Sequence, residues 1–254
     1  MQKRKVMGHM KLFIQKLILT ICAVTIAFCG WNIYYHYESI HQASISMSKY
    51  TTQVKASKDT EKVESPVSYD EMYARNTDYK GWLWFDSNLV SQPIMQTVEN
   101  KYYLIHDIDR NETLMGGAAF IDASNTMTDQ NITIYGHNLY TDTESFIFAP
   151  LKLLLNQTTY DQNQRFYIDW KDGVKTYQIF AVCDIDVSQD DWDYTQNVFY
   201  SDSEFYEFVR TAKKHSAVST DVDVKATDNL ITLQTCTLTG VSNRTVVIAK
   251  EITK

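Results

Sequence analysis

Residues 229–237 (NLITLQTCT) carry the clearest structural signal in the chain. Their β-branched and aliphatic side chains favour an extended strand, and Cys236 lies at the end of that strand. A thiol at a strand end is delivered to the rim of a sheet or barrel. On its own, however, a cysteine in a strand is more often an inert, small apolar residue.

Similar short β-rich runs, separated by turn residues, recur before and after this stretch. Many short strands at such spacing predict a sandwich or a barrel. The Asp-Gly pair within 171–173 also predicts a tight hairpin. The expected strands cover 82–85, 90–96, 102–105, 117–121, 131–135, 165–170, 176–182, 230–233 and 245–250.

Helical signals are fewer. Ser68 and Glu71 have the spacing of a capping box, which predicts a short helix reaching about Ala74. Helical patterns also cover 146–155 and 203–214. The latter lies in a long connection, 184–229, and connections of that length are usually functional or carry structure of their own.

The N-terminal part of the chain differs from the rest in charge and hydropathy. Residues 1–16 are basic, and 17–35 contain no charged residue, a length suited to crossing a membrane. A cleaved signal peptide is the competing interpretation, but its apolar region is usually shorter. The positive-inside bias predicts a cytoplasmic N-terminus and an extracellular remainder. We expect 36–67 to form a polar stalk and 68–254 to form the folded, mainly β domain.

Composition excludes several classes of function. The chain has 254 residues and a formal charge of −7; residues 1–35 hold five positive charges, and the remainder carries a net −12. Such an acidic body does not favour nucleic-acid binding. Cys183 and Cys236 are too few for a disulfide framework, although one bridge between them stays open. The sequence has no Cys/His cluster at zinc spacing and no evident acidic Ca²⁺ cluster.

Two further residues belong with Cys236. His137 follows the apolar run 131–135, and we expect Gly136 to make the turn that lets the imidazole leave the strand. Arg244 opens the last β-rich run, eight residues after Cys236. A thiolate nucleophile needs a nearby cation or acid-base partner, histidine can protonate a leaving amine, and arginine can hold an oxyanion. This set of three favours acyl transfer.

The motifs around these three residues resemble those of the sortases, the extracellular cysteine transpeptidases of Gram-positive bacteria. The run 232–236 (TLQTC) is similar to the family signature T-L-x-T-C. The run 135–138 (YGHN) and Arg244 match the other two catalytic positions in the same order. Further similarity lies in 81–84 (GWLW), 102–104 (YYL), 106–107 (HD) and 117–122 (GAAFID).

Within the family the chain most resembles class B. The resemblance implies a closed eight-stranded barrel with N-terminal helices and a helix between the sixth and seventh strands. It also implies catalysis by His137, Cys236 and Arg244, without a cofactor or metal. The residues it assigns to substrate binding are Tyr135, Asn138, Gln234 and Thr235.

The implied partners are proteins with a C-terminal sorting motif, cleaved at a Thr-x bond, and an acceptor amine. Gln234 and the short 236–244 interval favour a pilin-polymerising, streptococcal-type member, in which the amine is a pilin lysine. Anchoring of a surface protein, such as a haem-uptake protein, to peptidoglycan is the alternative. A hydrolytic cysteine protease and a non-catalytic surface β-domain are more remote alternatives.

Overall fold

The computed structural model describes residues 2–51, 63–112, 117–140, 145–236 and 242–252. The chain divides into two compact units, Met1–Gln42 and Ala43–Lys254. Helix α1 (Gln2–Thr51) spans the first unit and the start of the second. Its segment Phe13–Tyr35 has a mean hydropathy of 1.9 and is long and apolar enough to cross a membrane. The helix therefore extends well into the predicted stalk.

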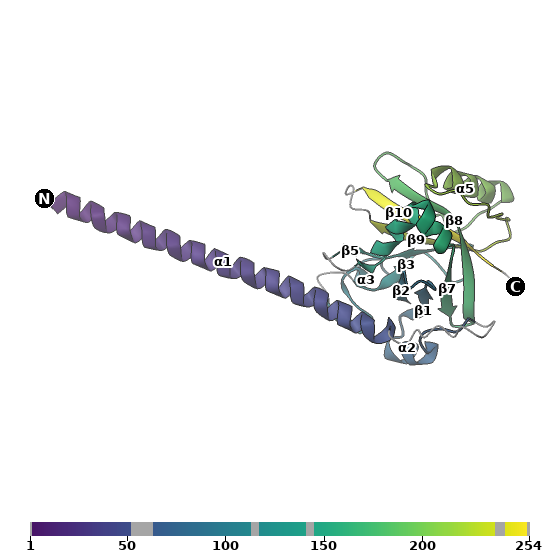
Figure 1. Ribbon diagram of the computed structural model, residues 1–254, viewed down its shortest axis with the longest axis horizontal. Helices are drawn as coiled ribbons and strands as arrows, with labels where there is room; N and C mark the ends of the chain where they lie inside the picture. Colours follow the sequence, from purple (N-terminus) through teal and green to yellow (C-terminus); the bar gives the residue numbers. More distant parts are fainter. Residues whose placement is uncertain (1, 52–62, 113–116, 141–144, 237–241, 253–254) are drawn as a thin grey trace. The chain divides into compact units, whose positions relative to one another are not determined.

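The second unit contains a closed barrel of eight strands, as predicted (Figure 1). Around the barrel the order is β1-β2-β3-β4-β9-β10-β8-β7. Two neighbouring pairs, β2 with β3 and β4 with β9, are parallel, and the others are antiparallel. The strands are β1 (Tyr79–Trp84), β2 (Ser91–Met95), β3 (Ala119–Ile121), β4 (Asn131–Tyr135), β7 (Arg165–Trp170), β8 (Gly173–Asp186), β9 (Leu230–Cys236) and β10 (Asn243–Glu251).

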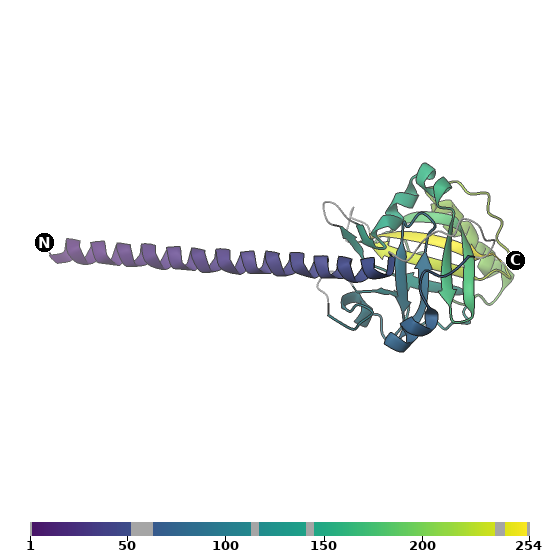
Figure 2. The same ribbon diagram turned by 60° about the horizontal axis from the view of Figure 1, so that its bottom comes forward.

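Apolar side chains pack on both sides of the barrel wall. One core cluster includes Leu83, Ile134, Ile168, Leu233 and Val247, and alternate residues of the same strands belong to two other clusters. This period of two is expected for strands buried on both faces. Figure 2 shows β10, in yellow, among the barrel strands. Burial of both faces makes the strand ends the natural place for chemistry.

The hairpin predicted at 171–173 is confirmed. Trp170 pairs with Gly173 where β7 turns into β8, and Gly173 has φ +112°, a conformation that side chains disfavour. The capping box is confirmed in part: the Ser68 hydroxyl accepts from the backbone N–H of Glu71 at the start of α2 (Tyr69–Arg75).

The helix predicted over 203–214 is α5 (Asp202–His215), which packs on β8 in the connection between the sixth and seventh barrel strands (Figure 1). Its buried face consists of Phe205, Phe208, Val209 and Ala212, which repeat at helical spacing. Cys183 of β8 belongs to the same cluster. The long connection therefore covers one outer face of the barrel.

Two predictions of local structure are wrong. Residues 102–105 form a short helix, α3 (Tyr102–Ile105), rather than a strand. Because β2 and β3 are parallel, the chain between them must cross back over the barrel, and a crossover has no place in the ladder. The predicted helix over 146–155 is a 3₁₀ helix, η1 (Ala149–Leu155), that begins later because β6 (Ser145–Ile147) pairs with β5 (Asn138–Tyr140). A further helix, α4 (Gln157–Gln162), follows η1.

Candidate active site

Three strand ends meet at one edge of the barrel. The parallel register pairs Tyr135 of β4 with Gln234 of β9, and the backbone N–H of Gly136 donates to the Gln234 carbonyl at 3.1 Å. On the other side of β9, the antiparallel register pairs Cys236 with Arg244 of β10. The backbone therefore brings together the three positions proposed for catalysis. The Cys236 side chain and residues 237–241 lie outside the described part of the chain.

His137 is held at two points. Its Nε2–H donates to the backbone carbonyl of Leu104, next to last in α3, over 2.7 Å. Its own carbonyl accepts the N–H of Phe148 at 3.0 Å. Because a carbonyl oxygen only accepts, the first bond puts the proton of the neutral ring on Nε2 and the lone pair on Nδ1.

Position 136 requires glycine because the structure leaves no room there for a Cβ atom. Its φ is not in the left-handed region, so other residues can adopt its backbone conformation. A Cβ at this position would lie 2.5 and 2.6 Å from two ring atoms of Phe148 and 3.0 Å from the Ile147 side chain. The turn therefore needs glycine because the Phe148 ring fills the place of a side chain.

Arg244 stands at the start of β10, half-buried. Its Nη1 donates to the carbonyl of Asn243 at 2.8 Å, and the Asn243 amide donates to Asp184 of β8. The guanidinium thus lies at the edge where β9 ends and β10 begins. It keeps its charge at any physiological pH.

Tyr135 is linked to a partly buried carboxylate. Its hydroxyl donates to Oδ2 of Asp122 at 2.7 Å, and Asn100 and Ser124 donate to the same carboxylate. Burial acts to raise the pKa of Asp122, but the hydrogen bonds from Ser124, Tyr135 and Asn100 outweigh it and lower that pKa. Burial, with the bond to Asp122, raises the pKa of Tyr135, so the hydroxyl stays protonated.

The other residues predicted to bind substrate lie in different environments. Gln234 is half-exposed, next to Tyr135. Asn138 starts β5, and its buried Oδ1 has no partner among the residues that the structure describes. Thr235 is fully buried and paired with Thr245 of β10, so it lies within the wall rather than at the surface. The structure brings Tyr135 and Gln234 together and leaves Thr235 without exposure.

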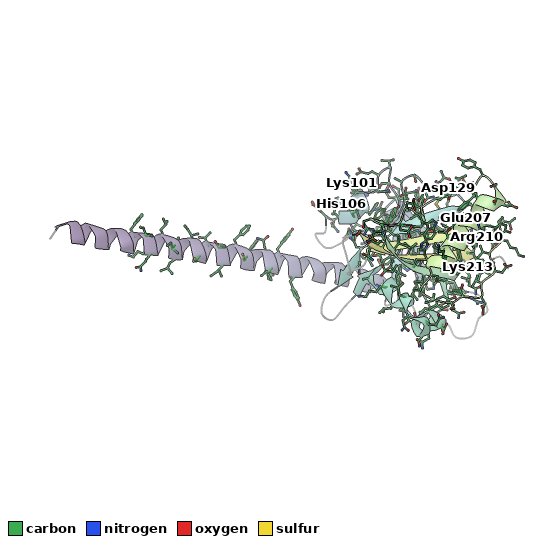
Figure 3. The ribbon with its side chains drawn as sticks, turned by 90° about the horizontal axis from the view of Figure 1, so that it is seen from above. Lys101, His106, Asp129, Glu207, Arg210 and Lys213 are labelled. Atoms are coloured by element: carbon green, nitrogen blue, oxygen red, sulfur yellow. The ribbon has the colours of Figure 1, made fainter. Side chains whose placement is uncertain are left out.

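The long connection begins at the edge of the site, where Asp186 pairs with Asn243, and it is attached again at the opposite end of the barrel. Asn131, the first residue of β4, donates from its buried amide to the carbonyl of Gln196 and accepts from the Thr232 hydroxyl. From there α5 extends over the outer face. In Figure 3 its charged residues Glu207, Arg210 and Lys213 lie on the opposite side of the domain from Lys101 and His106, which flank α3.

Most acids of this connection have structural partners. Asp186 accepts from Ser188 and Gln189, Asp193 accepts from Thr195, and Asp190 accepts Nε2–H of His215 over 2.9 Å. Such bonds are typical of turns. Asp191 is exposed on this loop.

Cys183 does not belong to the site. It is a free, fully buried thiol that donates to the Ala212 carbonyl, and burial with the nearby Asp190 raises its pKa to about 12. Its partner in β10 is Val246, whereas Cys236 pairs with Arg244 on the opposite side of β10. Two strand spacings, about 10 Å, separate their backbones, more than a disulfide spans. The bridge that the sequence left open is therefore excluded.

Within the described residues, no three His, Cys, Asp or Glu side chains are grouped to hold a metal ion. A cavity of about 660 Å³ lies where β9 begins and β10 ends, lined by Tyr69, Tyr73, Lys175, Asn229 and Glu251 among others. That is the barrel end opposite the candidate site, so this cavity does not serve it.

Residues 90–252 match the Sortase domain. The chain belongs to the sortase family. It is 28% identical to Sortase B of Listeria monocytogenes, over 89% of this chain and 91% of that protein, and 26% identical to Sortase B of Staphylococcus aureus, over 96% and 98%.

Solved structures agree with this assignment. Clostridium perfringens sortase B superposes with a TM-score of 0.67 at 26% identity, covering 73% of this chain and all of that one. A Staphylococcus aureus sortase B–substrate complex gives 0.70 at 25% identity, with 84% and 98% covered. This chain is a class B sortase, a family of cysteine transpeptidases that act on sorting-motif substrates.

Three features of this sortase's site were missed from sequence. The Leu104 carbonyl is a backbone group, and backbone groups leave no sequence signal. The sequence pattern predicts a helix over 146–155, which places Phe148 in a helix and not beside His137. Asp122 closes a β-rich run that contains no other charged residue, and an acid in that position is a usable signal.

In the Tyr135→Phe variant, the free energy of unfolding should depend less on pH in the acidic range than it does in the wild type. A carboxyl with a lowered folded pKa stabilises the fold above its unfolded pKa, about 4, and loses that contribution as pH falls through the folded pKa. The variant lacks one donor to Asp122, so we expect a loss of about 1.5 kcal/mol near neutral pH that shrinks below pH 4. Denaturant unfolding across pH measures this; an equal loss at every pH would contradict it.

Proposed function

We propose that Cys236 is the nucleophile of a transpeptidase that cleaves a Thr-x bond in a C-terminal sorting motif. The observation that carries the proposal is the meeting of the ends of β4 and β9 with the start of β10, which puts Cys236, His137 and Arg244 at one edge. The thiolate attacks the threonine carbonyl carbon and forms a tetrahedral intermediate. Its collapse breaks the C–N bond and leaves a thioacyl enzyme.

His137 manages the protons in both half-reactions. As imidazolium it protonates the departing amine, and as neutral imidazole it accepts a proton from the incoming amine, which attacks the thioacyl carbon and releases the thiolate. The bond from Nε2 to the Leu104 carbonyl favours Nδ1 as the nitrogen that exchanges this proton. The departing amine thus leaves with the proton of the imidazolium, and the proton of the incoming amine returns to the imidazole.

Arg244 stabilises the oxyanion of each tetrahedral intermediate. Its backbone is directly opposite that of Cys236, and cross-strand partners have Cβ atoms about 5 Å apart. A guanidinium presents several donors in a fixed geometry and takes no part in proton transfer. Tyr135 and Gln234, adjacent to each other across β4 and β9, line the site for the sorting motif.

We propose pilin polymerisation as the biological role, with a pilin lysine as the acceptor amine. Gln234 within TLQTC and the short 236–244 interval support this role. The exposed acids Asp184 and Asp191 add negative potential at the connection, which favours a lysine-bearing surface. Anchoring of a surface protein to peptidoglycan is the alternative, because the same chemistry accepts either amine.

We propose that the uncharged residues 17–35, within the apolar segment Phe13–Tyr35, form an uncleaved membrane anchor with the N-terminus in the cytoplasm. All five basic residues of 1–35 precede these uncharged residues, and cytoplasmic flanks carry such an excess. The class B domain then works outside the cell, where sorting-motif proteins emerge.

Cys236→Ala should abolish transfer and any covalent adduct with a sorting peptide, whereas Cys183→Ala should retain both because that thiol is buried. Arg244→Lys should lose about 10²- to 10³-fold in kcat, since one ammonium does not reproduce the fork. Mass spectrometry of products with a peptide panel and added amines measures this. Hydrolysis alone, even with amine present, would favour a protease, and full activity of Cys236→Ala would remove the nucleophile.

Protease added to intact protoplasts should digest the domain, because the anchor places residues 36–254 outside. A C-terminal epitope tag followed by immunoblotting reports the result. Disrupted protoplasts provide the control for access to cytoplasmic segments. A tag protected in intact cells and lost in disrupted ones would reverse the topology.

Deletion of the gene should eliminate high-mass covalent polymers from the cell surface. Immunoblots of wall extracts measure this. The Cys236→Ala variant expressed in the deletion strain should not restore the polymers, because their formation requires the activity of the protein and not only its presence. Intact polymers, with a single surface protein shed into the medium, would instead identify an anchoring enzyme.

A further inference from the structure

His137 is connected to the rest of the barrel through the residue that follows β6. The N–H of Phe148 donates to the His137 carbonyl at 3.0 Å, and Ile147 pairs with Asn138, the residue after His137. The backbone on both sides of the imidazole is thus fixed by 147–148. The Leu104 carbonyl is then the anchor of the ring itself.

The Phe148 side chain adds a steric constraint. It is completely buried in the barrel core, and its ring occupies the space that a side chain of Gly136 would need. Gly136 cannot move toward the core without colliding with the ring. The residue that precedes His137 is therefore in direct contact with a rigid, flat group.

Ile147 has an unusual conformation. Its φ is +55°, in the left-handed region, which is a genuine outlier for a β-branched residue. Its side chain is buried in the same core cluster. Strained backbone of this kind persists only where the surroundings enforce it, and it occurs most often at functional sites.

We propose that Phe148, presented by the left-handed Ile147, is a positioning residue that sets where His137 stands relative to Cys236. The inference rests on the proposed catalytic role of His137. Phe148 acts through Gly136 and the His137 backbone and touches no substrate. Its loss leaves the imidazole present but misplaced, and a shift of about 1 Å is enough to reduce turnover by about 10²-fold.

A purely structural role makes a different prediction. Phe166 of β7 is equally buried in the same cluster and belongs to a different part of the barrel wall. Phe166→Leu and Phe148→Leu remove the same atoms from the same core, so they should destabilise the protein similarly. If Phe148 is only a core residue, the two variants should also have similar kinetics.

The experiment compares Phe148→Leu, Gly136→Ala and Phe166→Leu in the full-length protein in detergent micelles. Gly136→Ala displaces the Phe148 ring without deleting any apolar group. The probes are a fluorogenic sorting peptide cleaved by the wild type and hydroxylamine as acceptor. We expect kcat to fall about 10- to 100-fold in the first two, with KM within about twofold, and to stay near wild type in Phe166→Leu.

NMR of ¹⁵N-histidine provides a readout that does not depend on activity. The wild type should give a His137 signal of the Nε2–H tautomer, and Phe148→Leu and Gly136→Ala should shift or broaden it while Phe166→Leu leaves it unchanged. An unchanged signal with kcat equal to that of Phe166→Leu would overturn the positioning role. Normal turnover by His137→Ala would instead overturn the proposed function. That outcome does not depend on the His137 signal of the other variants.

Discussion

The parallel pairing of β4 with β9 is the constraint on which the site depends. It joins two segments far apart in the sequence through main-chain hydrogen bonds, the last of them between Gly136 and Gln234. Once this pair is formed, β10 can only return antiparallel on the other side of β9, with Arg244 opposite Cys236. Three residues at or next to the ends of three strands are thereby brought together by backbone pairing.

Much of this arrangement is readable from sequence because strand chemistry is local. The alternation and β-branching of 131–135 and 165–170 predict β4 and β7 with their observed bounds, and the Asp-Gly pair predicts the turn between β7 and β8. The amphipathic spacing in 203–214 predicts α5 within one residue at each end. The convergence of His137, Cys236 and Arg244 followed from their places at strand ends and from the family motifs.

What sequence did not predict depends on partners distant in the chain. Residues 102–105 have strand-forming side chains, yet the crossover between two parallel strands makes them helical. Thr235 lies in the family motif, but strand alternation puts it on the face of Ile231 and Leu233, inside the wall. Gly136 was interpreted as a turn residue, and its actual constraint is the ring of Phe148. The helix at 102–105 and the ring packing at Gly136 are thus set by contacts between segments, whereas the burial of Thr235 follows from the alternation of its own strand.

The separation of Cys183 from Cys236 by β10 has a consequence for oxidative damage. A nucleophilic cysteine outside a cell, as proposed for Cys236, meets oxidants, and a sulfenic acid is rescued when a second thiol condenses with it. Cys183 is out of reach and, with its pKa of about 12, essentially never a thiolate. The two remaining cysteines, Cys22 and Cys29, lie in the apolar helix. None of these three cysteines can serve as a resolving thiol for the proposed nucleophile Cys236, so its repair would require an external reductant.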